Sequence, residues 1–194
     1  MSHSETWAVS PAAANTTLLR AAAAVAGAGA LTLLVNETSV QGCGYKLIFT
    51  SVGNSSGMTY TIVGNTVAQP NRKVTEVLTG PNATTGTTTN YWAYVDSITA
   101  SAAATGNQSI GITGSLALPR TRIQAVYWVG AAAAGTIVVA MAVSGVTKLN
   151  VDTPATATFA QYFKTGRIPL VGPTAVDFGV VTLTQVTKCT LICG

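Results

Sequence analysis

Residues 45–63 read YKLIFTSVGNSSGMTYTIV, two β-like runs on either side of a cluster of small polar residues. Tyr45, Leu47 and Phe49 occupy every second position of the first run, and Thr59–Val63 forms the second. A period of two is the side-chain period of a β-strand, whereas Gly, Asn and Ser between two such runs favour a turn. The stretch therefore predicts two strands joined by a turn.

The same pattern continues to the end of the chain. Turn residues recur every few positions and separate further runs at Lys73–Thr79, Tyr91–Thr99, Ser109–Thr113, Ile123–Val129, Thr136–Ser144, Val146–Val151, Ala157–Phe163 and Val180–Ile192. Strict alternation in the second of these runs would place Trp92, Tyr94, Asp96 and Ile98 on one face. We expect an all-β fold of antiparallel strands in a meander, built as two small β-sandwich domains of the jelly-roll or immunoglobulin-like kind.

A pause at Leu118-Pro119-Arg120 divides the strand pattern into two parts. It predicts a first sandwich domain over residues 31–115 and a second over residues 116–194. Residues 1–30 are Ala-rich and are predicted to form an N-terminal arm. Asn15 or Thr16 could cap a short helix in this arm, or the arm could be extended, and a strand is expected at Leu31–Val35.

Charged residues are few in this chain of 194 residues. It contains ten Lys and Arg and six Asp and Glu, for a formal net charge of +4, and the cations are scattered singly except for Arg72-Lys73 and Arg120 with Arg122. Scattered cations do not form the basic stripe that follows a phosphate backbone, so direct nucleic-acid binding is not expected. Much of the surface must be uncharged, which favours a protein covered by partner subunits.

The uncharged run from residue 123 to residue 147 is long enough to span a membrane as a helix. Its centre, Gly130–Gly135, consists of glycine and alanine, and both flanks are rich in β-branched and aromatic residues. Those flanks prefer a pleated sheet. We therefore predict two buried strands around a small-residue loop, and no membrane insertion.

The residues that catalysis would need are scarce. The single histidine, His3, lies in a polar N-terminal segment, so a nucleophile has no plausible base. A phosphate-binding Gly-Lys-Ser/Thr loop is absent from the sequence, and the six carboxylates have simpler roles in turns and on exposed strand positions. We expect no catalytic residues, no cofactor and no metal, so the chain is not predicted to be an enzyme.

The three cysteines, Cys43, Cys189 and Cys193, lack the spacing of a zinc site. They are interpreted as buried apolar residues. The alternative is a disulfide between Cys43 and one of the two C-terminal cysteines.

Aromatic residues are the other candidates for contacts. Inward-facing members of Tyr91, Trp92 and Tyr94 and of Tyr127 and Trp128 are expected in the core, and outward-facing members on contact surfaces. Trp7 is a candidate anchor on a neighbouring subunit, although a disordered terminus is an equal alternative.

Several segments carry a resemblance to a known group of proteins. They are residues 45–65, 74–85, 96–100 and 106–111, followed by residues 126–130, 149–154 and 167–172. Together their strand and turn patterns resemble those of structural proteins of tailed bacteriophages. The pattern departs near the end, where Cys189-Thr-Leu-Ile-Cys193 replaces the aromatic residues expected there.

The resemblance implies a virion component assembled in the host cytoplasm. We expect a capsid decoration or cement protein that packs as a homo-oligomer on the major capsid protein or on other virion subunits. Arg20, Arg120 and Arg122 are candidates for pairing with an acidic shell. The alternatives are a tail, tail-fibre or head-fibre component, including a host-binding module in which Tyr91, Trp92 or Trp128 stacks on glycans.

Overall fold

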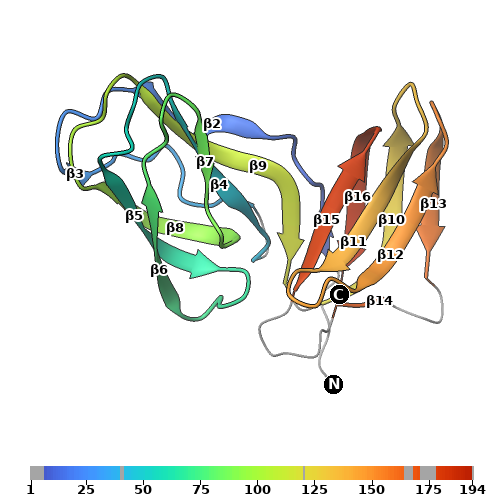
Figure 1. The fold of residues 1–194 in the computed structure, drawn as a ribbon. Helices are drawn as coiled ribbons and strands as arrows, with labels where there is room; N and C mark the ends of the chain where they lie inside the picture. Colours follow the sequence, from blue (N-terminus) through green and yellow to red (C-terminus); the bar gives the residue numbers. More distant parts are fainter. Residues whose placement is uncertain (1–6, 40–41, 120, 164–167, 171–177, 194) are drawn as a thin grey trace. The chain divides into compact units, whose positions relative to one another are not determined.

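The computed structural model describes residues 7–39, 42–119, 121–163, 168–170 and 178–193. The described residues form strands and turns, without a helix, and every strand pair is antiparallel. The all-β prediction is therefore confirmed. The chain divides into two compact units: unit 1 comprises residues 1–12 and 115–194, and unit 2 comprises residues 13–114 (Figure 1).

Unit 2 is a sheet of five main strands with three short or irregular additions. The strand order is β9–β4–β8–β5–β6, with β2 beside β9, β3 beside β8 and β7 beside β4. The bounds are β2 (Asn15–Ala23), β3 (Gly29–Ala30), β4 (Gly44–Ser51), β5 (Thr59–Thr66), β6 (Lys73–Thr79), β7 (Thr85–Thr87), β8 (Trp92–Ala100) and β9 (Gln108–Leu118).

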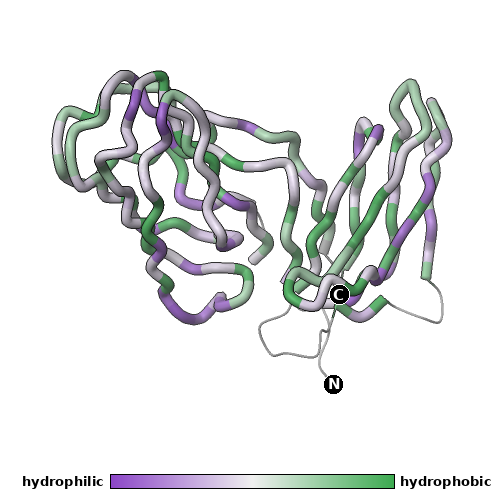
Figure 2. The backbone as a smooth tube through the Cα atoms, in the orientation of Figure 1, coloured by the Kyte–Doolittle hydropathy of each residue, from purple (hydrophilic) through white to green (hydrophobic). Residues whose placement is uncertain are grey.

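The core of unit 2 follows from the alternation seen in the opening stretch. Tyr45, Leu47 and Phe49 of β4 are buried, as are Tyr60 and Ile62 of β5. The rings of Phe49 and Tyr60 lie 4.8 Å apart between centroids. Hydrophilic residues gather in the turn between β5 and β6, which is the purple bend in Figure 2. Buried apolar residues thus lie on the strands and hydrophilic residues in the turn, as the sequence predicts.

Unit 1 has two sheets, which Figure 1 draws as two layers. One has the order β1–β16–β10–β13, with β14 also beside β10, and the other has the order β12–β11–β15 with the end of β9. The bounds are β1 (Trp7–Val9), β10 (Arg122–Gly130), β11 (Gly135–Met141), β12 (Thr147–Thr153), β13 (Thr158–Tyr162), β14 (Ile168–Pro169), β15 (Gly179–Thr184) and β16 (Val186–Cys193).

Each sheet of unit 1 buries alternate residues on one side. Val126 and Trp128 of β10 are buried in the first sheet, and Ile137 and Val139 of β11 are buried in the second. This division gives the unit a sandwich-like character.

The predicted strands around the small-residue loop are confirmed as β10 and β11, but the simple meander is wrong. β10 pairs with β13 and β16, whereas β11 pairs with β12 and β15, so the loop carries the chain from one sheet to the other. Unit 2 departs from a meander as well, because β5 lies between β6 and β8. Strands buried on one face can pair with any strand of matching pattern, so local alternation does not select the neighbour.

Two predictions for the N-terminal segment are also wrong. The helical alternative fails because residues 15–23 form β2, which pairs with β9 in unit 2. The strand expected at Leu31–Val35 is absent; that stretch bonds through Leu31 N–H to the carbonyl of Ile98 and exposes Leu34. β1 pairs with β16 inside unit 1. An arm on neighbouring subunits therefore stays a prediction.

Candidate interaction surface

Three neighbouring strands of unit 1, β16, β10 and β13, present one broad face away from the core. Tyr127 of β10 lies opposite Ala160 of β13 and Thr190 of β16 in the sheet register. The next residues along, Trp128 and Cys189, are buried on the other side of the same sheet. Since side chains alternate along a strand, Tyr127 and its cross-strand neighbours share the side of the sheet that faces away from the core. We call this side the outer face.

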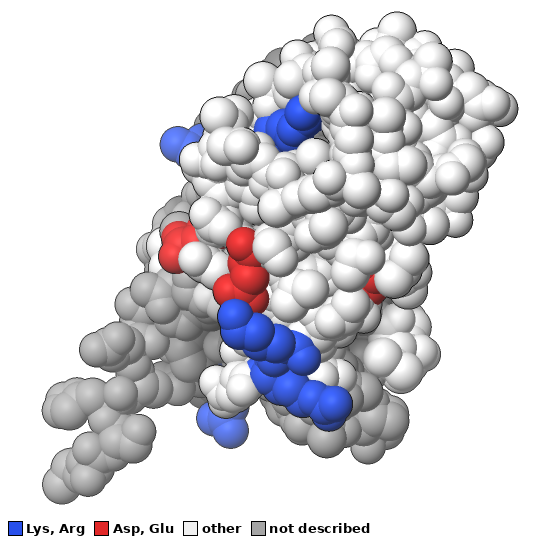
Figure 3. All heavy atoms as spheres, turned by 90° about the vertical axis from the view of Figure 1, so that its left-hand side faces the viewer, with Lys and Arg blue, Asp and Glu red and all other residues white. Residues whose placement is uncertain are grey.

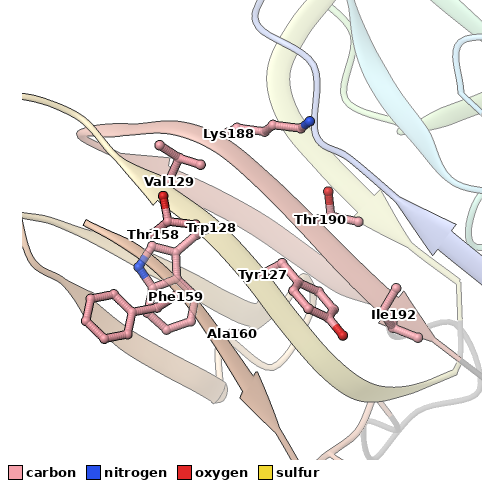
Figure 4. Close-up of a pocket in the computed structure, with 9 residues that line it drawn as sticks. All are labelled: Tyr127, Trp128, Val129, Thr158, Phe159, Ala160, Lys188, Thr190 and Ile192. Atoms are coloured by element: carbon pink, nitrogen blue, oxygen red, sulfur yellow. The ribbon is translucent and has the colours of Figure 1, made fainter. Parts of the chain in front are cut away.

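The outer face is hollowed to form a groove of about 600 Å³. This is a size typical of ligand or side-chain sites. Figure 4 shows the groove residues carried by the three neighbouring strands. They are Tyr127, Val129, Thr158, Ala160, Lys188, Thr190 and Ile192 of the outer face, together with Trp128 and Phe159, which the register assigns to the other side of the sheet.

An aromatic pair borders this groove. The rings of Tyr127 and Tyr162 meet edge to face with centroids 5.5 Å apart, and their hydroxyl groups form a hydrogen bond. The hydrogen bond to Tyr162 raises the pKa of Tyr127 above its ordinary value, and loss of solvent adds to this effect. The phenol of Tyr127 is therefore neutral at neutral pH, and it presents ring surface rather than charge.

A second aromatic pair bridges β10 and β13. Trp128 stacks on Phe159 with centroids 5.8 Å apart, and Phe159 remains 48% exposed. The two rings overlap in Figure 4. The indole Nε1 of Trp128 is buried without a hydrogen-bond partner in the described part of the chain. The edge of this sheet thus carries exposed apolar surface at Phe159.

The groove is poor in charge and in catalytic groups. Among its lining residues Lys188 is the single charged side chain, and the polar remainder is the hydroxyl groups of Tyr127, Thr158 and Thr190 and the indole N–H of Trp128. Thr190 bonds through its hydroxyl to that of Ser10 at 2.9 Å. A surface of aliphatic side chains, aromatic rings and hydroxyls has no acid–base pair within it, but it can bury area against another protein at low desolvation cost.

No protein-family model, curated protein or solved structure matches this chain.

The four residues predicted as partner contacts lie in different places. Trp7 belongs to β1, where its backbone is opposite Cys193, and its side chain lies outside the described residues. Arg120 is also outside the described residues. Arg122 is exposed at the start of β10. The structure brings none of the described candidates into the groove, and their contact roles stay predictions.

Arg20 has a structural role within unit 2. Its side chain is 9% exposed, and its guanidinium donates to the carbonyls of Gln108 at 2.6 Å, Ala24 at 2.9 Å and Ala23 at 3.1 Å. A guanidinium has five N–H donors in a fixed fork, which suits several carbonyls at once. The side chain therefore ties the segment after β2 to β9.

The aromatics proposed for glycan stacking are not equally accessible. Trp92 is fully buried and Trp128 is 7% exposed, so the interpretation of inward-facing aromatics as core is confirmed for both, and neither offers an open ring face. Tyr91 is partly exposed and receives the ammonium of Lys46 at 5.2 Å from its ring centroid. The most exposed rings are instead those of Phe159 and Tyr162, which the sequence placed in a strand but did not single out, and Tyr94 is 39% exposed.

The cysteines are buried, as predicted, and Cys43, Cys189 and Cys193 are present as thiols rather than in a disulfide. Burial raises the pKa of both Cys189 and Cys193 to about 12. In the part of the chain that the structure describes, no group of three or more His, Cys, Asp and Glu side chains could hold a metal ion.

Two carboxylates of unit 2, Glu76 and Asp96, are engaged within the unit. Glu76 accepts hydrogen bonds from the backbone N–H groups of Thr89, at 2.6 Å, and Asn90, at 3.1 Å. Asp96 pairs with Lys73 at 2.7 Å. Figure 3 shows a face of the molecule on which uncharged atoms dominate and cationic and anionic groups form small clusters.

The described ranges contain no helix of the length and hydrophobicity that a membrane span needs.

Proposed function

We propose that this chain is a non-enzymatic structural protein that works by packing against other protein subunits. The observation that carries the proposal is the outer face of β16, β10 and β13, a groove of about 600 Å³ with one charged side chain. Such a face is costly to leave in water and is favourable to cover.

The more specific proposal is a virion component of a tailed bacteriophage, and within that class a capsid decoration or cement protein. It is supported by the resemblance of the strand and turn patterns to phage structural proteins. Decoration would act by adding interface area, roughly 1,600 Å² at each contact, to every site of the shell lattice. The partners would be the major capsid protein or other virion subunits, and copies of the chain itself.

Two finer features belong to this proposal. One is that each unit is a β-sandwich domain of the jelly-roll or immunoglobulin-like kind. The other is that the N-terminal segment, with Trp7, reaches a neighbouring subunit. Arg122, which is exposed, fits the role of pairing with an acidic shell.

A tail, tail-fibre or head-fibre component that binds the host is the second candidate. The exposed rings of Tyr162, at 62%, and Phe159, at 48%, favour it, because open aromatic faces stack on sugars and other planar or ring-shaped ligands.

A charged residue placed in the groove should block assembly without preventing folding. Val129→Lys would put a second cation on the face that carries Lys188, its cross-strand neighbour. We expect this variant to fold but to be lost from particles. Asn150→Lys is the matched control, because it adds the same charge at an exposed position of β12, in the other sheet of unit 1. Equal incorporation of the two variants would contradict packing through the outer face.

Tyr162→Ala distinguishes the second candidate. If the chain binds host glycans, this variant should leave particle composition unchanged and abolish attachment of particles to cells. If it decorates the shell, attachment should be unchanged.

A further inference from the structure

β13 is an edge strand whose outer side is unpaired in the described part of the chain. It pairs with β10 and with no other described strand. The N–H of Gly130 bonds to the carbonyl of Ala157, and the N–H of Phe163 bonds to the carbonyl of Gln124. In an antiparallel ladder hydrogen-bonded pairs alternate, so residues 157, 159, 161 and 163 turn their backbone groups toward β10. Thr158, Ala160 and Tyr162 therefore turn their N–H and carbonyl groups toward the open side.

The composition of β13 does not protect this edge. Its sequence, Thr-Phe-Ala-Gln-Tyr, has no charge and no proline, and all five residues are exposed. The other long edge strands with a continuous ladder differ: β6 carries Lys73 and Glu76, and β12 carries Lys148 and Asp152, whereas β2 pairs with β9 at only three positions and with shifts in register. Charged side chains on an edge are the usual protection against pairing with another chain. Among the long, regularly paired edges, β13 is therefore the one best suited to accept a further strand.

We infer that β13 pairs antiparallel with β13 of a second copy of this chain, about a two-fold axis at Ala160. The open groups fall at positions 158, 160 and 162, which are symmetric about residue 160. Thr158 would lie opposite Tyr162 of the second copy, and Ala160 opposite its own counterpart. The six open backbone groups of each copy, three N–H and three carbonyl groups, would then all form hydrogen bonds with the other copy, as an isologous interface requires.

Side chains on both sides of the strand support this register. Phe159 would lie opposite Gln161 of the second copy, so the exposed ring that stacks on Trp128 would lose water without meeting a charge. On the outer face, Tyr162 would lie beside Thr158 of the second copy. The sheet β1–β16–β10–β13 would continue into that of the second copy, and the two grooves would lie on one extended face.

The inference rests on the proposed function as a subunit-packing protein, and it names the contact between copies. It differs from that proposal in being testable on the purified chain alone. The chain should sediment as a mixture of its 19.7 kDa monomer and a species of twice that mass, and the heavier species should dominate at roughly 100 µM.

Ala160→Pro tests the register. It removes an N–H that the bond to β10 does not use, so the monomer should fold, but pairing across the open edge should fail. Ala160→Lys is the second disruptive variant, because it places two ammonium groups opposite each other at the axis. Ala160→Thr is the matched control, since it keeps the N–H and suits a strand. Near-ultraviolet circular dichroism verifies that each variant is folded.

We expect the wild type and Ala160→Thr to dimerise and the proline and lysine variants to be at least tenfold weaker. A wild type that stays monomeric at every concentration would overturn the inference, as would a dimer that both disruptive variants leave intact. If the chain is found in particles but is monomeric when isolated, the β13 contact is rejected and the virion role is kept. If the chain forms a β13-dependent dimer but is absent from particles, the virion role is rejected and the β13 contact is kept.

Discussion

The side-chain amide of Gln108 donates to the hydroxyl of Ser51 at 2.7 Å, and the two residues are buried in unit 2. The same amide lies 3.1 Å from the hydroxyl of Ser55, while its oxygen accepts from the hydroxyl of Tyr60 at 3.1 Å. Buried polar groups are tolerated when they are bonded to one another. Gln108 thus holds three hydroxyl groups that have been withdrawn from water.

Replacing this glutamine should destabilise unit 2. Gln108→Ala leaves the three hydroxyls short of a partner and opens a cavity, so we expect a loss of about 3 kcal/mol in the free energy of unfolding. Tyr60→Phe removes only one bond of the set and should cost about 1 kcal/mol. Urea unfolding measures both, and equal midpoints for Gln108→Ala and wild type would show that the network contributes nothing.

Two glycines of β9 differ in their distance from the N-terminal segment. Gly111 is approached closely by β2, whereas Gly114 lies farther from Ala14, the residue before β2. A methyl group on Gly111 would lie 1.8 Å from the carbonyl oxygen of Asn15, whereas one on Gly114 would lie 3.5 Å from the nitrogen of Ala14. Gly111→Ala should therefore displace β2 and destabilise the chain by about 2 kcal/mol. Gly114→Ala should be neutral or slightly stabilising, because it restricts the unfolded chain. The prediction fails if thermal unfolding ranks the two variants the other way.

The C-terminal thiols should be inert in the folded chain. Burial raises the pKa of Cys189 and Cys193 to about 12 from an ordinary value of 9.0. At pH 8 their thiolate fraction is very small, so alkylation should be at least roughly 100-fold slower in the native state than in urea. Rapid labelling of native protein at these two positions, located by peptide mass analysis, would contradict their burial.

The same shift predicts a change of stability with pH. Between pH 9 and pH 12 the unfolded chain releases two protons that the native thiols keep, so stability should fall as pH rises through this window. Below pH 9 the two thiols stay protonated in both the native and the unfolded chain, so they should not make stability depend on pH. A double variant, Cys189→Ala with Cys193→Ala, should show a shallower decline in urea midpoint, and an unchanged slope would exclude the thiols as its cause.

The tyrosine pair of the outer face has a spectroscopic test. The hydrogen bond to Tyr162 is the main cause of the raised pKa of Tyr127. Tyr162→Phe keeps the ring but removes that bond, so the pKa of Tyr127 should fall toward its ordinary value. Ultraviolet titration follows phenolate formation. The variant Tyr91→Phe, which leaves the pair untouched, serves as the control.

Period-two alternation was sufficient to predict the strands but not their neighbours. Ile123–Val129 and Thr136–Ser144 have the composition of buried strands, and the structure places the first in β10 and the second, as far as Met141, in β11. One partner of the first is β16, some sixty positions later in the chain, and nothing local to either strand specifies that pairing. The groove depends on this long-range register, so the sequence could supply its residues but not their assembly.

Bulges explain why one predicted face was wrong. Opposite β5, the register of β8 shifts between Ser97 and Val95 and again between Tyr94 and Trp92. Each shift inserts one residue and reverses the sides of those that follow. Trp92 and Ile98 are consequently buried, while Tyr94 is exposed and Asp96 reaches Lys73.

Arg20 illustrates a different limit of sequence reasoning. An isolated cation in an Ala-rich segment is normally solvated. Its burial depends on three backbone carbonyls, one of which belongs to Gln108, far along the chain. Only the fold brings these acceptors together.

Quantitative mass spectrometry of purified particles from the source lysate tests the virion proposal most directly. The copy number of this chain would be measured against that of the major shell protein. Decoration of the shell lattice predicts hundreds of copies per particle, whereas a handful of copies would place the chain in the tail or its fibres. Absence from the particle would contradict the virion role.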